Sequence, residues 1–173
     1  MLATELRSFI RDVPDFPKKG VLFKDITPLL QDGAAYREAV EGLYRLIQER
    51  SFDRIVSMEA RGFILGGTLA NRLGVGFVPV RKKGKLPYTT RQNTYALEYG
   101  KDTIEIHADA VRLGDRVLIV DDVLATGGTS RATVELVESL GATVGALLFL
   151  IELTFLKGRE RLGGYDVFSL IQY

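Results

Sequence analysis

The stretch from Val117 to Thr129, V-L-I-V-D-D-V-L-A-T-G-G-T, carries most of the structural information in this sequence. Four aliphatic residues of high strand propensity lead into two carboxylates, and a loop of small and hydroxyl residues follows before a helix begins. Strand–loop–helix units of this kind build parallel α/β sheets, which bind ligands at the carboxyl ends of their strands. The segment therefore predicts both a fold class and the place of a site.

The rest of the chain continues this alternation. We expect strands at 54–57, 77–80, 116–120, 143–151 and 166–171, and helices at 2–11, 33–50, 63–72 and 129–140. Continuous Val/Ile/Leu strands separated by amphipathic helices indicate a mostly parallel central sheet flanked by helices. The chain has 173 residues and no linker of biased composition, so we expect one domain.

Two segments depart from the alternation. Pro14 and Pro17 are expected to end the first helix, and residues 16–28 follow as an irregular, partly extended stretch. Later, a polar insertion rich in Thr and Tyr interrupts the pattern, with hairpin-like strands expected at 94–99 and 103–107. An insertion of this length beside the carboxyl ends of the strands is typical of a mobile lid.

Composition excludes several classes of function. The chain contains no cysteine, which excludes disulfides, zinc–thiolate sites and thiol nucleophiles and fits a cytoplasmic protein. The net charge of +1 gives no case for nucleic acid as a partner. No apolar stretch approaches the roughly 18 residues that a membrane-spanning helix needs, so no membrane partner is expected either.

The loop Ala125, Thr126, Gly127, Gly128 and Thr129 is suited to bind a phosphate monoester. Glycines let backbone N–H groups approach an anion, the two threonines add hydroxyl donors, and the helix amino terminus adds partial positive charge. No lysine follows the glycines, and the G-x-G-x-x-G spacing is missing, so neither a Walker A loop nor a dinucleotide fingerprint is present. The alternative is a purely structural glycine-rich turn.

The neighbouring carboxylates, Asp121 and Asp122, would repel a second phosphate. They are suited instead to accept hydrogen bonds from ribose hydroxyls, or to arrange magnesium through water. A 5-phosphorylated ribose meets both demands, because its phosphate fits the loop and its diol fits the acids.

The same stretch closely resembles the phosphoribosyl-diphosphate signature of the type I phosphoribosyltransferases, with lettering most similar to the members that act on adenine. The resemblance covers essentially the whole chain, through E-L-T-F-L-K-G-R-E near Ile151 to Glu160. It implies transfer of a 5-phosphoribosyl group from phosphoribosyl diphosphate to adenine, giving AMP and diphosphate in purine salvage. It also implies magnesium held through substrate and water, an amino-terminal hood at about 12–30, a lid at about 82–99, and a homodimer.

A second anion site is needed for the diphosphate leaving group. In the resemblance, its loop matches Glu59, Ala60, Arg61 and Gly62, and the basic residues Arg81, Lys82 and Lys85 follow the next strand. Arg61 and Arg81 are expected to assist catalysis by neutralising the departing charge. The alternatives are a surface salt bridge between Glu59 and Arg61, and a solvated basic loop.

The resemblance assigns the base site to the hood and the lid. Leu22, Phe23 and Lys24 match residues that bind adenine, partly through their backbone, and Phe23 offers an aromatic face for stacking. Tyr99 belongs to the same set. Glu98 is expected to manage a proton on the purine, although it is alternatively a surface residue of the hairpin.

Two alternatives concern the activity itself. Family members that use hypoxanthine or guanine typically carry Glu-Asp in place of Asp121-Asp122 and an aspartate in place of Ala125, so this chain is not expected to use 6-oxopurines. A transferase for another base and a non-catalytic nucleotide sensor remain open. His107, the only histidine, is expected to be structural.

Overall fold

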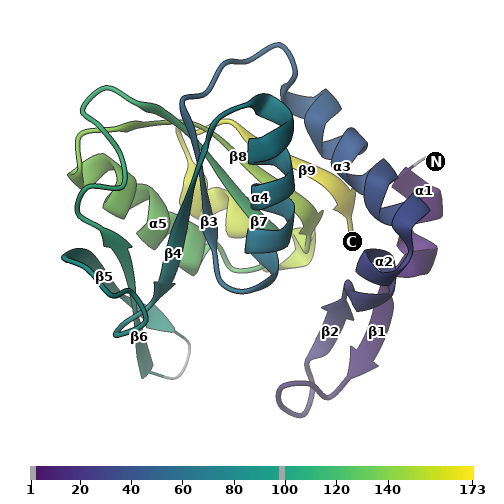
Figure 1. The fold of residues 1–173 in the computed structure, drawn as a ribbon. Coiled ribbons are helices and arrows are strands. Elements are labelled where there is room, and N and C mark those ends of the chain that lie inside the picture. Colours follow the sequence, from purple (N-terminus) through teal and green to yellow (C-terminus); the bar gives the residue numbers. More distant parts are fainter. Residues whose placement is uncertain (1–2, 98–99) are drawn as a thin grey trace.

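The computed structural model describes residues 3–97 and 100–173, and this part of the chain contains a seven-stranded sheet, a separate two-stranded hairpin and helices (Figure 1). The strands are β1 (Arg11–Pro14), β2 (Leu22–Asp25), β3 (Arg54–Met58), β4 (Gly76–Lys82), β5 (Thr90–Leu97), β6 (Gly100–His107), β7 (Arg116–Leu124), β8 (Thr143–Glu152) and β9 (Val167–Gln172). The α-helices are α1 (Ala3–Leu6), α2 (Thr27–Gln31), α3 (Gly33–Ile47), α4 (Arg61–Leu73) and α5 (Gly128–Ser139). Short 3-10 helices are η1 (Arg7–Phe9), η2 (Thr154–Leu156) and η3 (Gly158–Leu162).

The strand order of the large sheet is β5-β6-β4-β3-β7-β8-β9. The five strands from β4 to β9 in this order pair in parallel, and β6 joins β4 antiparallel. From β3 the chain moves first to β4 on one side and later to β7 on the other, so the direction of winding reverses between β3 and β7. Open α/β sheets bind ligands in the crevice beyond such a switch point. The predicted α/β class, with a central mostly parallel sheet, is confirmed.

The alternation of side chains along β7 divides the core into two layers. Leu118 and Val120 pack with α3 and α4 on one face, whereas Val117 and Ile119 pack with α5 on the other. All four of these side chains are fully buried. Because both faces are covered, all four positions from Val117 to Val120 are apolar, as the sequence pattern predicted.

The long helices begin and end where their sequences dictate. Asp32 caps α3, and its Oδ1 accepts hydrogen bonds from the N–H groups of Ala34 (3.0 Å) and Ala35 (2.8 Å). Gly74 ends α4 in the left-handed conformation at φ +69°. The helix predicted at 63–72 thus lies within α4, which begins at Arg61.

The amino-terminal prediction is partly wrong. A helix was expected over 2–11, but the chain is already extended at Ile10 and continues into β1. Residues 11–14 pair antiparallel with 22–25 along the whole of β1, and this pairing prevails over the local helical spacing of apolar residues. The stretch expected to be irregular therefore contains β2 and the start of α2, where Oδ1 of Asp25 accepts from the Thr27 N–H (2.9 Å).

The polar insertion forms a hairpin of β5 and β6, which we call the arm. Its first strand begins at Thr90, earlier than the expected residue 94, and its pairing runs from Thr90–His107 to Leu97–Gly100. The arm and the β1–β2 hairpin project from the same edge of the molecule, on either side of the strand ends (Figure 1). These two hairpins therefore flank the predicted site.

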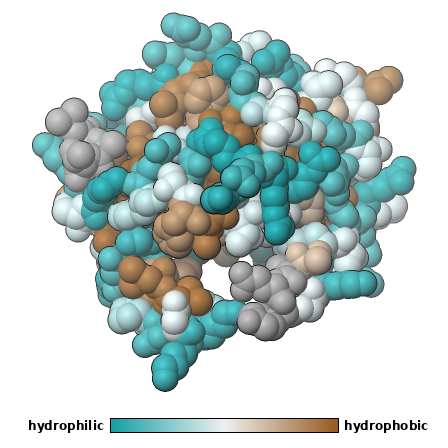
Figure 2. Space-filling view, turned by 180° about the vertical axis from the view of Figure 1, so that it is seen from behind, coloured by the Kyte–Doolittle hydropathy of each residue, from teal (hydrophilic) through white to brown (hydrophobic). Residues whose placement is uncertain are grey.

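In the described ranges no helix is long and apolar enough to cross a membrane. On the face opposite to the view of Figure 1, hydrophobic groups are interrupted by hydrophilic side chains (Figure 2).

Candidate active site

A polar cavity of about 320 Å³ lies at the switch point, between the loop after β3 and the end of β7. Its walls come from the loop after β3, the end of β4, the arm, the end of β7 and the first turn of α5. They include Glu59, Ala60, Arg61, Arg81, Lys82, Tyr95, Asp121, Asp122 and Thr129. Eight of the residues that the sequence singled out thus line one cavity, although their segments lie far apart in the chain.

Asp121 and Asp122 stand near the end of β7 and both line this cavity. The Asp121 carboxylate lies against the first turn of α4, since a Cβ at Gly62 would come within 2.6 Å of its Oδ1. The same oxygen accepts a hydrogen bond from the Asp122 N–H (2.9 Å). Glycine at position 62 is therefore required for the close approach of α4 to the acids.

The two acids have different electrostatic surroundings. Burial, together with the negative charge of Asp122, raises the pKa of Asp121 well above its ordinary value. Asp122 is itself buried, and its Oδ2 accepts a hydrogen bond from Nε of Arg61. Asp122 thus has a cationic partner, while Asp121 is held in a place that disfavours its charge.

The loop of residues 125–129 leads directly into α5, and we call it the phosphate loop. Gly127 is the N-terminal flanking residue of α5 at φ +81°, and no side chain caps the helix among the described residues. A Cβ at Gly127 would lie 2.5 Å from the carbonyl oxygen of Gly158. Both the backbone conformation and the space require glycine here.

Arg61 connects the polar cavity with the hood. Besides its contact with Asp122, its guanidinium lies 4.8 Å from the centre of the Phe23 ring. The surface salt bridge between Glu59 and Arg61, considered from the sequence, is not formed. Arg61 instead contacts a buried acid and an aromatic face, which hold it at the boundary between the two parts of the site.

Glu59 makes its contacts with the strand that follows. Its Oε2 lies 3.1 Å from Nη2 of Arg81, and its Oε1 accepts from the Lys82 N–H (2.5 Å). Burial raises the pKa of Glu59, but the hydrogen bonds from Lys82 and Arg81 outweigh it and lower the pKa overall. Glu59 therefore stays ionised and orients the Arg81 guanidinium.

The remaining basic residues lie around this pair. Lys82 Nζ is 3.4 Å from Oδ2 of Asp102 and is largely exposed. The exposed Lys85 accepts a hydrogen bond at its carbonyl oxygen from Nη1 of Arg81 (3.3 Å). Within the described chain, the buried Nε of Arg81 has no hydrogen-bond partner.

An apolar cavity of about 290 Å³ lies between the hood and the loop after β7. The hood contributes Leu22, Phe23 and Lys24, as the sequence predicted for the base site. The opposite wall consists of Arg61, Asp122, Val123, Ala125, Leu153 and Leu156. Ala125 thus faces the hood across an apolar space, in the place where a carboxylate was expected for a 6-oxopurine.

The side chain of Lys24 does not point into this cavity. Its Nζ lies 2.6 Å from Oδ1 of Asp12 and 3.9 Å from the centre of the Tyr173 ring. The ammonium group thereby joins β2 to β1 and to the carboxyl-terminal residue. The Lys24 ammonium group therefore makes its contacts with Asp12 and Tyr173, which do not line this cavity.

The arm contacts the phosphate loop through Tyr95. The Tyr95 hydroxyl lies 2.9 Å from Oγ1 of Thr129, and burial raises the pKa of this tyrosine. Nothing in the sequence distinguished Tyr95 from the other polar residues of the insertion. Glu98 and Tyr99 lie outside the described residues.

Two further features bear on the predictions. In the described part of the chain, no group of three or more His, Cys, Asp or Glu side chains is arranged to hold a metal ion. His107 contacts Tyr88 edge-on, with ring centres 6.1 Å apart, away from both cavities.

Sequence reasoning missed the far wall of the apolar cavity. Leu153 and Leu156 belong to E-L-T-F-L-K-G-R-E, a stretch that the sequence predicts to be part of the family resemblance but not of the site. Two leucines after a buried strand could have indicated an apolar wall, because that strand end was already expected to border the site.

Comparison with known proteins agrees with this geometry. Residues 25–162 match the family described as "Phosphoribosyl transferase domain". Adenine phosphoribosyltransferase of Thermotoga neapolitana is 57% identical over 169 residues, 98% of this chain and 99% of that protein. The same enzyme of Desulfitobacterium hafniense is 58% identical over the full length of both chains.

Solved structures give the same relationship. The crystal structure of adenine phosphoribosyltransferase from Thermoanaerobacter pseudethanolicus superposes with a TM-score of 0.97 at 57% identity, covering 99% of each chain. The Saccharomyces cerevisiae enzyme, solved with adenine and an imino-altritol bisphosphate, has a TM-score of 0.91 at 44% identity, covering 97% of each chain.

Proposed function

The chain belongs to the adenine phosphoribosyltransferases of the phosphoribosyl transferase family, and we propose that its two cavities divide the two substrates between them. The enzyme transfers the 5-phosphoribosyl group of phosphoribosyl diphosphate to adenine and forms AMP and diphosphate. One observation supports this assignment of the two substrates: Arg61 and Asp122 belong to the walls of both the polar and the apolar cavity.

Adenine occupies the apolar cavity in this proposal. The ring of Phe23 and the leucines of the opposite wall supply flat apolar surface, which suits a purine. Ala125 leaves room and adds no charge. The backbone of the hood is available to recognise the amino-pyrimidine edge, and residues 12–30 act together as a hood over the base.

The phosphoribosyl group occupies the polar cavity. Residues 125–129 bind the 5-phosphate through backbone N–H groups at the start of α5 and through threonine hydroxyls. Asp121 and Asp122 accept hydrogen bonds from the ribose hydroxyls. The 5-phosphate therefore binds at the amino terminus of α5 and the diol at the end of β7.

The diphosphate lies toward the loop after β3. Arg61 and Arg81 stand on that side of the polar cavity, with Lys82 and Lys85 beside them. Their positive charge stabilises the negative charge that gathers on diphosphate as it leaves. Glu59 holds Arg81 in place for this purpose, through the contact described above.

The donor set of the polar cavity fits magnesium held through substrate and water. Two adjacent carboxylates offer hard oxygen atoms, and no third acidic side chain among the described residues completes a protein-only site. When bound, the ion would supply positive charge to the diphosphate leaving group. Asp121 and Asp122 would hold it through water.

Catalysis consists of displacement at the anomeric carbon with inversion. The bond from this carbon to the diphosphate oxygen breaks, a bond to a purine ring nitrogen forms, and that nitrogen loses its proton. In this proposal Glu98 accepts the proton, Tyr99 helps to bind the base, and residues 82–99 form a lid that excludes water. Positioning and electrostatics supply the rate enhancement, with no covalent enzyme intermediate.

The test is a panel of bases. Purified protein, magnesium and phosphoribosyl diphosphate are incubated separately with adenine, hypoxanthine, guanine, xanthine and orotate, and nucleotide formation is followed. AMP from adenine alone, abolished by a chelator, is the expected result. Product from another base would contradict the assignment of the apolar cavity, and nucleotide binding without any product would favour a sensor over an enzyme.

The proposal includes the oligomeric state and the cellular location of the enzyme. We infer a homodimer working in the cytoplasm, with no nucleic acid or membrane partner, on the basis of the resemblance and the balanced charge. Sedimentation of the purified protein checks the dimer.

A further inference from the structure

The segment that follows β8 packs its backbone directly against the phosphate loop. A Cβ at Gly158 would overlap the carbonyl oxygen of Ala125 and lie 3.0 Å from the Gly127 nitrogen. The converse contact, from Gly127 to the Gly158 carbonyl, was described above. Two loops that touch backbone to backbone leave no room for a side chain to adjust, so the position of one determines the position of the other.

The contact is supported on both sides of Gly158. The Leu153 N–H donates to the Leu124 carbonyl oxygen (2.9 Å) and joins the ends of β8 and β7. A guanidinium nitrogen of Arg161 lies 3.5 Å from the place of a Cβ at Gly128. The segment from 153 to 161 therefore forms a backing behind Ala125, Gly127 and Gly128 of the phosphate loop.

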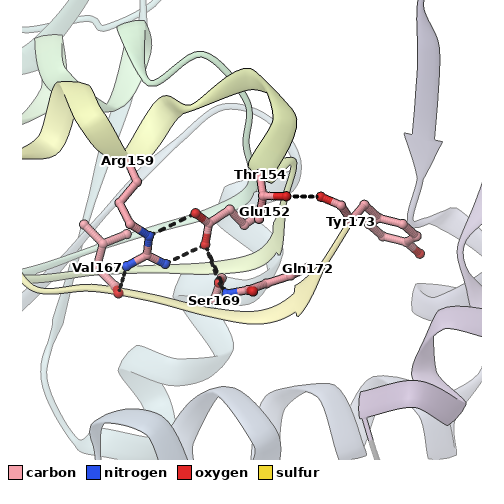
Figure 3. A network of polar contacts seen from close by, with 7 residues as sticks. All are labelled: Glu152, Thr154, Arg159, Val167, Ser169, Gln172 and Tyr173. Carbon is pink, nitrogen blue, oxygen red and sulfur yellow. Dashed lines mark hydrogen bonds and ion pairs between the residues drawn. The ribbon is translucent and has the colours of Figure 1, made fainter.

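Arg159 anchors this backing to the sheet through Glu152, the last residue of β8 (Figure 3). Its Nε and Nη2 donate to the two carboxylate oxygens of Glu152 at 3.0 and 2.5 Å, and its Nη1 donates to the Val167 carbonyl oxygen (2.6 Å). Ser169 donates from β9 to the same carboxylate (2.6 Å). A bidentate pair with two further bonds fixes the guanidinium in direction as well as distance.

The charge of Glu152 is part of this anchor. Its side chain is 6% exposed. The hydrogen bond from Arg159, followed by that from Ser169, lowers its pKa despite burial. The carboxylate therefore remains ionised at neutral pH and keeps all of its bonds to Arg159.

We propose that Arg159 and Glu152 are positioning residues for the 5-phosphate, acting through Gly158 on the phosphate loop. Neither residue lines the polar cavity or the apolar cavity. Their effect is to hold the loop's N–H groups where the phosphate oxygens need them. This inference rests on the proposed assignment of the phosphate loop.

A displaced loop loses phosphate affinity, because hydrogen bonds to an anion depend on direction and distance. Shifting a positioned group by about 1 Å can reduce rates by about 100-fold. Loss of the anchor is therefore expected to act on phosphoribosyl diphosphate and AMP, which carry the 5-phosphate, and not on adenosine, which lacks it.

The experiment compares Arg159→Met with the wild-type enzyme. The dissociation constants of AMP and adenosine are measured by calorimetry, along with kcat and the KM of both substrates. We expect AMP binding and the KM for phosphoribosyl diphosphate to worsen by about 10- to 100-fold, with adenosine binding unchanged. Arg159→Lys keeps the positive charge but cannot donate to all three acceptor oxygens at once. Its affinity for AMP should therefore lie between those of the wild type and Arg159→Met.

The control is Arg54→Met. Arg54 makes a comparable ion pair with Asp115 (2.6 Å), but this pair lies at the amino ends of β3 and β7, away from the cavities. The Arg54→Met substitution should lower the melting temperature of the protein. It should leave the ratio of the AMP and adenosine affinities unaltered. Equal losses for AMP and adenosine in Arg159→Met, or the same change of ratio in Arg54→Met, would overturn the inference.

Failure of the inference can be told apart from failure of the proposed function. Turnover of adenine by the wild-type enzyme tests the function alone, whereas the affinity ratio requires no turnover. If Arg159→Met does not fold, Glu152→Gln replaces it, since it keeps the size of the side chain and removes the charge. An unchanged affinity ratio in Glu152→Gln and Arg159→Lys would also overturn the inference.

Discussion

The hydroxyl of Tyr95 lies 2.9 Å from Oγ1 of Thr129, so the arm directly contacts the loop assigned to the 5-phosphate. The ring also lies close to Gly128, 3.7 Å from the place where a Cβ would stand. The position of the arm and the state of the phosphate loop are thereby linked through one side chain.

Tyr95→Phe removes this hydrogen bond and keeps the ring. A hydrogen bond of this kind contributes about 1 kcal/mol, which corresponds to about a fivefold rise in the KM for phosphoribosyl diphosphate. The KM for adenine should stay the same. Steady-state kinetics checks both values, with Tyr88→Phe as the control, because Tyr88 lies in the same insertion but contacts His107. Equal changes in the two variants would contradict the link.

Asp121→Asn should make the substrate-free protein more stable while impairing catalysis. The pKa of Asp121 is raised in the folded state, so ionisation costs folding free energy above its ordinary pKa of 3.8, and this cost vanishes where both states are protonated. The variant should therefore melt higher at pH 7, by about 2–4 °C for each 1 kcal/mol relieved, and equal the wild type near pH 3. Thermal scans across this range check it.

The same substitution removes a charge assigned to the ribose. Asp121→Asn combined with Asp122→Asn should abolish most turnover, and near-normal rates in the double variant would contradict the assignment. Asp115→Asn is the matched control, since Asp115 is a paired carboxylate beside β7 at the opposite end of the strand.

Phe23→Ala tests the apolar cavity. Stacking of a base on an aromatic ring contributes about 1–3 kcal/mol, so the KM for adenine should rise by about 5- to 150-fold. The KM for phosphoribosyl diphosphate should change far less. Phe155→Ala serves as the control, because Phe155 is exposed and lies outside the walls of the cavity despite standing beside Leu156. A rise in both KM values to the same degree would contradict separate sites.

Gly127→Ala tests the fit of the phosphate loop. A methyl group would press on the Gly158 carbonyl at 2.5 Å, in addition to the strain of φ +81°. Gly114→Ala isolates the strain, because Gly114 has φ +83° with open space around it and does not line either cavity. We expect Gly114→Ala to lose about 1 kcal/mol of stability and keep its kinetics, and Gly127→Ala to lose phosphate-dependent binding. Similar kinetics in the two variants would show that the close contact is unimportant.

The sheet and its helices were predictable because their signals are local. Burial is predicted directly by the V-L-I-V sequence of β7 and by the apolar faces of α3 and α4. The change from helix to the extended strand β1 could not be predicted, because the spacing of apolar residues over 2–11 fits a helix. Only the pairing of β1 with β2, a contact between separate segments, decides otherwise.

The site was predictable in its loops but not in its contacts. The phosphate loop and the acids could be found from residue types in order. The partners of Arg61 and Glu59 could not, because Asp122 is 61 residues from Arg61 and Arg81 is 22 residues from Glu59. For the same reason Tyr95, which is 34 residues from Thr129, carried no signal in the sequence.

Arg61 belongs to the wall of the polar cavity, of the apolar cavity, and of a third space of about 280 Å³ beside Phe16 and Phe23. One guanidinium cannot adopt independent positions toward the base and toward the sugar donor. We therefore expect the affinities for the base and for the donor to be linked. Thermodynamic linkage is symmetric, so the factor by which adenine changes the binding of the donor should equal the factor by which the donor changes the binding of adenine.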